Sequence, residues 1–283
     1  MIHCLLTPKR DMRLGRAGGD ANFGHANSRH DGGLSLGQTS APMRVPTNRL
    51  LAALPAEDLA ALWPRLEPVE LAEQYPLHRH GEPIRSVYFP ESGWTSLLAN
   101  LADGGSAEVG IIGREGMVGL PVLFGEDRAE FDVLVQGPGT ALRLSNVSFR
   151  EEMDRNPTFR RIMLRYALAR HIQSTQLSAC SARHHVDQRL ARKLLMAHDR
   201  AGGDRFPVTH ESLALMLGVR RAGVTVAAGQ LQRAGLIRYA AGHVTITHRA
   251  GLEAFACECY GVIHAGYERL LGAAAETGLA ERR

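Results

Sequence analysis

Residues 208–237 read VTHESLALMLGVRRAGVTVAAGQLQRAGLI, and this pattern predicts two short helices around a tight turn. Thr209 is a favoured helix-start residue, and Gly218 ends the first helix because glycine tolerates the positive φ of a helix terminus. A second helix begins near Arg220 and has apolar residues at helical spacing, namely Val224, Ala227, Ala228 and Leu231. The stretch is therefore predicted to be a helix-turn-helix with basic side chains at the start of its second helix.

Two short alternating runs follow this motif directly. They are Leu236–Tyr239 and His243–Ile246, and the Ala-Ala-Gly sequence between them is a hairpin turn signal. Two helices joined by a glycine occur in many folds, but a helix-turn-helix followed by a small hairpin is the pattern of a winged helix. The hairpin therefore strengthens the interpretation of residues 208–237 as a DNA-binding element.

Length and composition set wide limits. The 283 residues suffice for two domains, and 45% of them are hydrophobic. No apolar run approaches the ~18 residues needed to span a bilayer, and the first ten residues do not form a signal peptide. The four cysteines are scattered and suggest no disulfide framework. A cytoplasmic protein with no membrane segment is expected.

Charge is distributed unevenly along the chain. Residues 50–150 carry 7 Arg and Lys against 14 Asp and Glu, whereas residues 183–249 carry 11 against 4. Phosphate contacts need basic charge, and here it coincides with the helix-turn-helix. Although a solvated basic face is common, the coincidence favours nucleic-acid binding.

The N-terminal region has a different character. Residues 1–45 contain Gly-Gly pairs and many polar residues with almost no periodic apolar pattern, so a disordered extension is expected. Met43 stands just before the first ordered-looking element. We hypothesise that translation starts there and that residues 1–42 are absent from the native protein; mass spectrometry showing an N-terminus at Met1 would reject this.

The remaining pattern predicts an α+β fold with a first domain at residues 46–150. Leucines at helical spacing over 47–66, interrupted at Pro55, predict two short helices. From Val69 to Leu144 the period changes to two, and glycines separate the short runs, which is typical of a β-roll or jelly roll. The alternating runs are Val87 and Phe89; Leu97, Ala99 and Leu101; Val109 and Ile111; Val133 and Val135; and Leu142 and Leu144.

A long helix is predicted within residues 151–182, opened by a cap and proline at Asn156-Pro157. One side (Phe159, Ile162, Met163, Tyr166) is expected to cover the β-roll, and the other (Leu164, Leu168, Ile172) to pack on the same helix of a second subunit. Burial of both sides within a monomer is the alternative. Residues 183–250 then form the winged helix-turn-helix domain, including a helix at 185–200, and residues 251–283 form a C-terminal helix, Ala250–Leu271, and a fraying tail.

This order of elements resembles the Crp/Fnr family of bacterial transcription regulators over roughly residues 46–250. The most specific parts are residues 208–237 and GREGMVGLPVLFG at 113–125, which looks like the family's nucleotide-binding loop. The resemblance implies a cyclic-nucleotide-binding-like β-roll, a long dimerisation helix and a C-terminal winged helix-turn-helix. It also implies a homodimer that binds double-stranded DNA and contacts RNA polymerase, with a signal at the β-roll that re-aims the DNA-binding domains.

The sensor region departs from nucleotide-binding members. Leu120 stands where their ribose-binding glutamate lies, and Arg128 lacks the following hydroxyl residue that helps hold the cyclic phosphate. The pocket is expected to be lined by Glu126, Asp127, Glu130 and Asp132, and these acidic residues would repel a phosphate. We therefore expect no binding of cyclic AMP. An iron–sulfur cluster is not expected either, because the single N-terminal cysteine, Cys4, cannot supply four thiolates.

The second helix of the motif also departs from well-known members. Arg221 matches their first arginine and can fork onto a guanine, whereas Ala222 and Val226 replace a glutamate and a second arginine and can at most touch a thymine methyl. The operator should therefore differ. Further candidates for DNA contact are Arg220, Thr225 and, less well placed, Gln230, with Thr209 and His210 at the start of the first helix and Arg238 and His243 in the wing.

No catalytic or metal-binding constellation is found in the sequence. His78 and His80 would need a further ligand, and Cys257 and Cys259 have the wrong spacing for a zinc knuckle and are expected to point to different faces of one helix. An enzyme, such as a cupin-type β-roll, is therefore not expected. The main alternative function is a β-roll sensor or docking protein with a basic tail that binds nucleic acid without sequence preference, which competition with unrelated DNA would distinguish.

Overall fold

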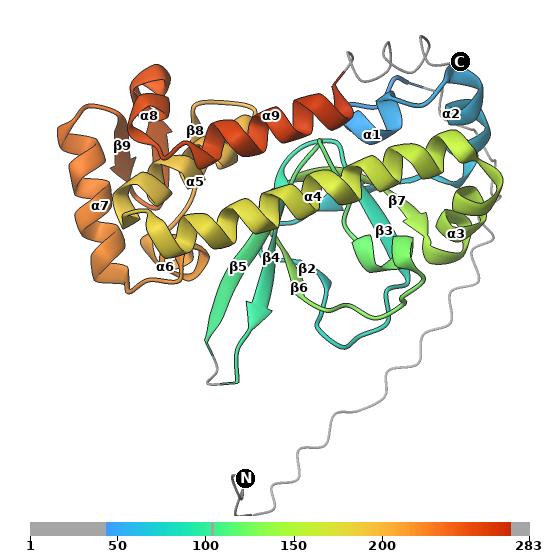
Figure 1. The fold of residues 1–283 in the computed structure, drawn as a ribbon, viewed down its shortest axis with the longest axis horizontal. Coiled ribbons are helices and arrows are strands. Elements are labelled where there is room, and N and C mark those ends of the chain that lie inside the picture. Colours follow the sequence, from blue (N-terminus) through green and yellow to red (C-terminus); the bar gives the residue numbers. More distant parts are fainter. Residues whose placement is uncertain (1–43, 103–104, 273–283) are drawn as a thin grey trace, which may run out of the picture. The chain divides into compact units, whose positions relative to one another are not determined.

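The computed structural model describes residues 44–102 and 105–272, and Figure 1 shows the arrangement of their elements. Residues 1–43 of the expected N-terminal extension and the tail after residue 272 lie outside these ranges. Within them, no helix combines the length and apolarity needed to cross a lipid bilayer.

The described chain begins with two short helices, as the leucine pattern predicts. They are α1 (Arg49–Ala52) and α2 (Ala56–Leu62), followed by the 3₁₀ turn η1 (Trp63–Arg65). The Asn48 side chain accepts hydrogen bonds from the amides of Leu50 and Leu51 and so caps α1. Both leucines are completely buried, which anchors this segment on the core.

The β-roll consists of two antiparallel sheets. One has the order β1-β7-β3 and the other β2-β6-β4-β5. The strands are β1 (Glu67–Leu71), β2 (Pro76–His78), β3 (Ser86–Pro90), β4 (Trp94–Asn100), β5 (Ser106–Ile112), β6 (Asp132–Gly137) and β7 (Gly139–Ser145), with the 3₁₀ turn η2 (Leu120–Phe124) between β5 and β6.

One strand differs from the predicted alternation. Leu97, Ala99 and Leu101 are predicted to alternate along one strand. Leu97 faces the interior of the β-roll, where it packs against Ile112 and Val133, but Leu101 lies beyond the end of β4 and is 57% exposed, and Leu98 on the other face of the strand is buried as well. A β-bulge shifts the pairing of β4 with β5 by one residue at Leu97 and Leu98, but its extra residue, Val109, lies in β5, so β4 keeps its own alternation. The prediction is therefore wrong only at the end of the strand, which lies at Asn100.

After the β-roll, α3 (Asn146–Arg155) leads into the long helix α4 (Pro157–Arg183). The Asn156 side chain accepts a 2.9 Å hydrogen bond from the Phe159 amide, so the predicted cap is confirmed. The side of α4 predicted to face the roll is buried. On the opposite side, Leu164 and Leu168 remain 49% and 46% exposed.

The C-terminal part contains a three-stranded sheet and five helices among the described residues. These are α5 (Val186–Ala201), β8 (Arg205–Pro207), α6 (His210–Leu217), α7 (Arg221–Arg233), β9 (Ile237–Ala240), β10 (His243–Ile246), α8 (Arg249–Phe255) and α9 (Cys259–Leu271). The sheet order is β8-β10-β9, so the predicted hairpin is joined by a strand that the sequence pattern did not indicate.

The expected single helix over 250–271 is wrong in its centre. Ala256 has an extended backbone (φ −64°, ψ 157°), so α8 ends before it and α9 starts afresh at Cys259. The second helix lies alongside α4 (Figure 1). There Gly266 faces the Ile172 side chain, which was expected to contact a second subunit. Helix α9 therefore covers part of the face assigned to dimerisation.

Candidate nucleic-acid interface and sensor cavity

The helix-turn-helix is formed by α6, the turn at Gly218 and α7. The Thr209 side chain accepts a hydrogen bond from the Ser212 amide, and the Ser212 hydroxyl accepts one from the Thr209 amide, which makes a capping box. Gly218 has φ +62° and closes α6, as the sequence predicts. Arg220 is the N-cap residue of α7, so Arg220 and Arg221 lie at the first turn.

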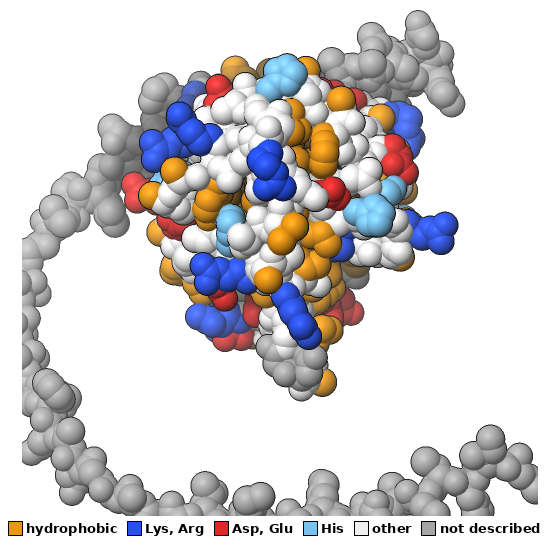
Figure 2. Space-filling model, turned by 90° about the vertical axis from the view of Figure 1, so that its left-hand side faces the viewer, with side chains coloured by type: hydrophobic (Ala, Val, Ile, Leu, Met, Phe, Trp, Pro, Cys, Tyr) orange, Lys and Arg blue, Asp and Glu red, His pale blue; other side chains and the backbone are white. Residues whose placement is uncertain are grey.

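Helix α7 has one buried and one exposed face. Val224, Ala227, Ala228 and Leu231 are buried at the predicted spacing. The predicted DNA-contacting residues of the helix are all exposed: Arg220, Arg221, Ala222, Thr225 and Val226. The Arg221 side chain is 70% exposed, and its guanidinium lies 3.8 Å from the exposed Glu211 carboxylate. Figure 2 looks at the end of the molecule where α7 lies, and Lys and Arg side chains are spread over this face.

His210 connects the first helix to the second helix and to the wing. Its Nδ1 lies 3.1 Å from the Thr225 hydroxyl, and its ring stacks on Tyr239 with centroids 4.3 Å apart. Burial and the nearby positive charge of Arg221 lower the pKa of His210 below its ordinary value. The ring therefore helps to order the motif, and the phosphate contact expected for His210 stays a prediction.

The wing places two further predicted residues at the same end. The hairpin turn contains Ala241 at φ +49° and Gly242 at φ +74°, as a two-residue turn with both central residues left-handed requires. Arg238 is exposed on β9, and half-buried His243 has its Nδ1 3.1 Å from the Ala241 carbonyl oxygen.

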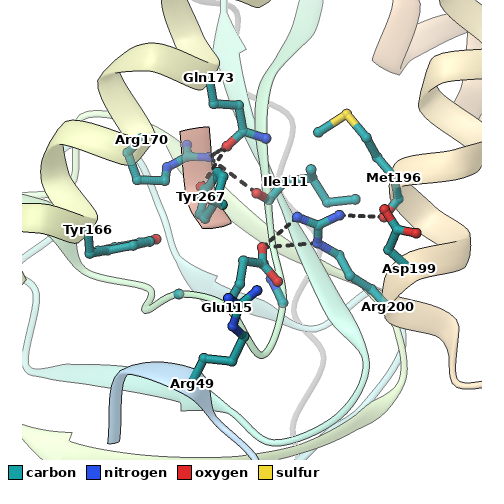
Figure 3. Close-up of polar contacts among 12 residues, drawn as sticks. Arg49, Ile111, Glu115, Tyr166, Arg170, Gln173, Met196, Asp199, Arg200 and Tyr267 are labelled. Carbon is teal, nitrogen blue, oxygen red and sulfur yellow. Dashed lines mark hydrogen bonds and ion pairs between the residues drawn. The ribbon is translucent and has the colours of Figure 1, made fainter. Parts of the chain in front are cut away.

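Part of the basic charge of residues 183–249 does not face solvent. Lys193 on α5 forms a buried pair with Glu108 on β5, with both carboxylate oxygens 2.5 Å from its Nζ. Arg200 reaches Glu115 in the loop after β5, at 3.0 Å and 2.6 Å (Figure 3). The basic charge of this segment is thus divided: basic residues of α5 pair with acidic residues of the β-roll, whereas arginines at the start of α7 face solvent.

The Glu115–Arg200 pair belongs to a larger buried network (Figure 3). Burial would raise the pKa of Glu115, but Arg200 and the Gly113 amide hold it below its ordinary value. Nearby, Arg170 on α4 donates to the Ile111 carbonyl at 3.2 Å and also contacts Gln173. The network joins the loop after β5 to both long helices.

The sensor cavity lies in the β-roll beside η2 and has a volume of about 290 Å³. Its lining is largely apolar and includes Leu97, Ile112, Leu120, Phe124, Phe131 and Val133. Among its lining residues Arg170 is the single arginine, and no lysine contributes, whereas Glu126 and Glu130 also line it. Such a lining suits an apolar ligand better than a phosphate.

Only some of the residues that the sequence aligns with the nucleotide-binding motif line this cavity. Leu120 lines it, as expected for its place in the loop, but Arg128 is turned to the Gly81 carbonyl, which it contacts at 2.8 Å. Asp127 and Asp132 do not line the cavity, contrary to the sequence-based expectation. Asp132 instead accepts hydrogen bonds from the His80 amide and Asn100.

Comparison with protein families matches both halves of the chain. Residues 68–156 match the cyclic nucleotide-binding domain, and residues 188–255 match the Crp-like helix-turn-helix domain. Together the two models cover more than half of the 283 residues. No curated protein sequence shows significant similarity to the chain.

Solved structures share the fold at low sequence identity. FixK2 from Bradyrhizobium japonicum aligns with a TM-score of 0.59 and 15% identity over 68% of this chain and 98% of its own. CLP, a c-di-GMP-responsive global regulator of Xanthomonas campestris, aligns with a TM-score of 0.57 and 19% identity over 68% and 99%. A CRP/FNR-family regulator from Thermus thermophilus gives 0.56 and 20% over 67% and 98%.

The two matched domains occur in the order that the fold displays, with a β-roll first, a long helix after it and a winged helix-turn-helix near the C-terminus. The exposed basic start of α7 lies inside the matched helix-turn-helix domain. The chain therefore belongs to the Crp/Fnr family of DNA-binding transcription regulators.

Proposed function

We propose that this protein is a cytoplasmic homodimer that recognises a specific DNA sequence through α7 and regulates transcription in contact with RNA polymerase. Its action rests on binding rather than catalysis. The observation that carries the proposal is the exposed first half of α7, where Arg220, Arg221, Thr225 and Val226 are all free of the core. A helix presented in this way fits the major groove of B-DNA.

Within this surface Arg221 is expected to contribute most to sequence specificity. An arginine at the start of a recognition helix can donate two hydrogen bonds to O6 and N7 of guanine. Ala222 and Val226 offer only apolar contact, suited to a thymine methyl. Arg238 on the wing is placed to contact phosphate, which contributes affinity without sequence information.

The test compares two arginines on operator DNA selected from a random pool. The Arg221→Ala variant should lose about 1–3 kcal/mol and accept any base at one operator position, whereas Arg238→Ala should weaken binding to all sequences equally and reduce the salt slope by about one. Equal binding by wild type and Arg221→Ala would contradict the assignment. If unrelated DNA in excess abolishes wild-type binding, the protein binds nucleic acid without sequence preference and the regulator proposal fails.

Dimerisation is supported by the exposed leucines of α4. Leu164 and Leu168 lie one turn apart, and arginines of α4 flank them in a shallow depression. A second copy of α4 would cover them and set two α7 helices on successive major grooves. Because α9 covers Ile172, the contact is confined to the first half of α4.

Sedimentation of the full chain tests this contact. Leu168→Asp should convert a dimer into a monomer, because it would bury a charge in an apolar contact. The matched control is Val147→Asp, which changes an apolar, 68% exposed side chain on α3 instead of α4. A dimer that survives Leu168→Asp would place the interface elsewhere.

We also propose that the β-roll does not bind cyclic AMP. Support comes from the acidic and apolar lining of the cavity and from the engagement of Arg128 with Gly81. Calorimetry with cyclic AMP should give no heat of binding beyond dilution. Low-micromolar affinity would overturn this part of the proposal and leave the DNA-binding part intact.

A further inference from the structure

We propose that Cys180, His184, Cys257 and Cys259 form a mononuclear zinc site that joins the end of α4 to the junction between α8 and α9. The three thiol sulfurs and a ring nitrogen of His184 all lie within 4.8 Å of one another. The three cysteines are buried, with at most 3% of their surface exposed. Three thiolates and one imidazole are a common ligand set of structural zinc sites.

The positions of these residues follow from the local backbone. Cys180 and His184 are four residues apart at the end of α4, so they share one face of the helix. Cys257 and Cys259 lie on either side of Glu258, where the chain turns from α8 into α9. The interruption at Ala256 lets both thiols point toward α4, which a continuous helix would prevent.

The distances suit one tetrahedral ion. The Cys180 and Cys257 sulfurs are 3.5 Å apart, and the Cys259 sulfur lies 3.5 Å from Nδ1 of His184. Zinc–ligand bonds of about 2.0–2.3 Å in a tetrahedron separate neighbouring ligand atoms by roughly 3.3–3.8 Å. A sulfur separation of 3.5 Å is too long for a disulfide, whose bond is about 2.05 Å.

Groups around the four residues support the same interpretation. Nδ1 of His184 faces the thiols, while its Nε2 lies 3.2 Å from the Glu258 carboxylate. A metal-bound histidine characteristically donates its other ring N–H to a carboxylate, which fixes the tautomer and the ring orientation. Gln176 donates a hydrogen bond of 3.1 Å to the Cys259 sulfur.

The charge balance also favours a metal thiolate centre. Zn²⁺ with three thiolates and a neutral imidazole carries one net negative charge. Arg192 on α5 is only 5% exposed, its Nε has no hydrogen-bond partner among the described residues, and its charge acts on Cys180. A buried arginine requires a negative partner, and the zinc centre would supply it.

The site would join the long helix α4 to the helices that follow the wing. It would fix the start of α9 against the end of α4, immediately before α5 begins. Arg189 on α5 lies close enough to Cys180 and Cys257 to interact with them electrostatically. It also donates a hydrogen bond to the Leu217 carbonyl at the end of α6. The zinc centre would thus stabilise the connection between the long helix and the helix-turn-helix.

The first experiment measures metal in the full chain purified without chelator. Wild type should contain about one zinc per chain, Cys257→Ser should contain almost none, and the matched control Cys4→Ser should retain it. To separate metal loss from misfolding, chelator-stripped wild type is titrated with Co²⁺, which should give the visible absorption of a tetrahedral ion and a thiolate charge-transfer band at one equivalent.

A second variant tests the role of Glu258. Glu258→Ala should weaken Co²⁺ and Zn²⁺ binding by about 10–100-fold, because His184 loses its orienting carboxylate, whereas Glu253→Ala on α8 should leave affinity unchanged. Absence of zinc together with absence of Co²⁺ binding overturns the proposal. Iron with sulfide in the purified protein, or a Cys180–Cys257 disulfide in a non-reducing peptide map, also overturns it.

Discussion

Replacing Glu115 with glutamine should cost far more stability than an ordinary surface substitution. The Glu115 and Arg200 side chains are only 10% and 8% exposed, so the change would leave a buried guanidinium without its counter-charge. Removing one partner of a buried ion pair costs about 3–5 kcal/mol. Glutamine keeps an oxygen that can still accept a hydrogen bond from the Gly113 amide. The loss of stability in Glu115→Gln therefore reports the removal of the negative charge alone.

The assay is urea unfolding followed by circular dichroism, with a matched surface pair as control. Glu67 and Arg143 also form an ion pair between strands, but their side chains are 63% and 43% exposed. Glu67→Gln should therefore cost no more than about 1 kcal/mol. Adding Arg200→Met to Glu115→Gln should recover much of the loss, because it removes the unpaired charge.

The result that would refute this reasoning is a Glu115→Gln variant no less stable than Glu67→Gln. A double variant whose loss equals the sum of the two single losses would likewise show that the two side chains do not interact energetically. Either outcome would mean that α5 is held on the β-roll by other contacts, such as the buried Lys193–Glu108 pair.

Three further predictions follow from the same structure. Folding lowers the pKa of Glu115, so at pH values just below the ordinary pKa of 4.5 the unfolded chain binds more protons than the folded chain. The free energy of unfolding should therefore fall as the pH drops below 4.5, and it should fall less steeply in Glu115→Gln. Urea unfolding at several pH values measures both slopes. His210 should titrate below 6.5 by NMR, and Arg221→Ala should raise its pKa, since the charge of that arginine contributes to the shift; an unchanged pKa would contradict this electrostatic effect. Gly137→Ala would place a Cβ 2.1 Å from the Trp94 ring and should cost about 1–3 kcal/mol, whereas Gly223→Ala meets no atom within 4 Å and should stabilise α7 by about 0.5–1 kcal/mol in thermal unfolding.

Local signals predicted the parts of the fold that depend on local backbone preference. The cap at Asn156, the left-handed Gly218 and the Ala-Ala-Gly turn each fix φ and ψ over a few residues, and the structure has a helix start, a helix end and a hairpin at these places. The buried side of α7 followed from helical spacing alone. Exposure of Arg221 could be predicted too, because it lies in the first turn of α7, before the first buried residue, Val224.

Features that depend on pairing between distant residues could not be predicted in this way. Cys180 and Cys257 are 77 residues apart, and their convergence depends on the break at Ala256, a residue with good helix propensity. Whether Ile172 packs against α9 or against a second chain depends on where the tertiary fold places α9. Period and composition do not contain that information.

The geometry of the loop after β5 suggests how the sensor cavity and the DNA-binding part communicate. Ile112 lines the cavity, and the next residue, Gly113, donates its amide hydrogen to the Glu115 carboxylate. That carboxylate holds Arg200, so one peptide bond and two polar contacts lead from the cavity wall to α5. A ligand that displaces Ile112 would shift Glu115, and the buried ion pair would transmit the shift because its strength falls steeply once its geometry is lost. We therefore expect Glu115→Gln to weaken any effect of a cavity ligand on DNA affinity while leaving ligand binding itself largely unchanged.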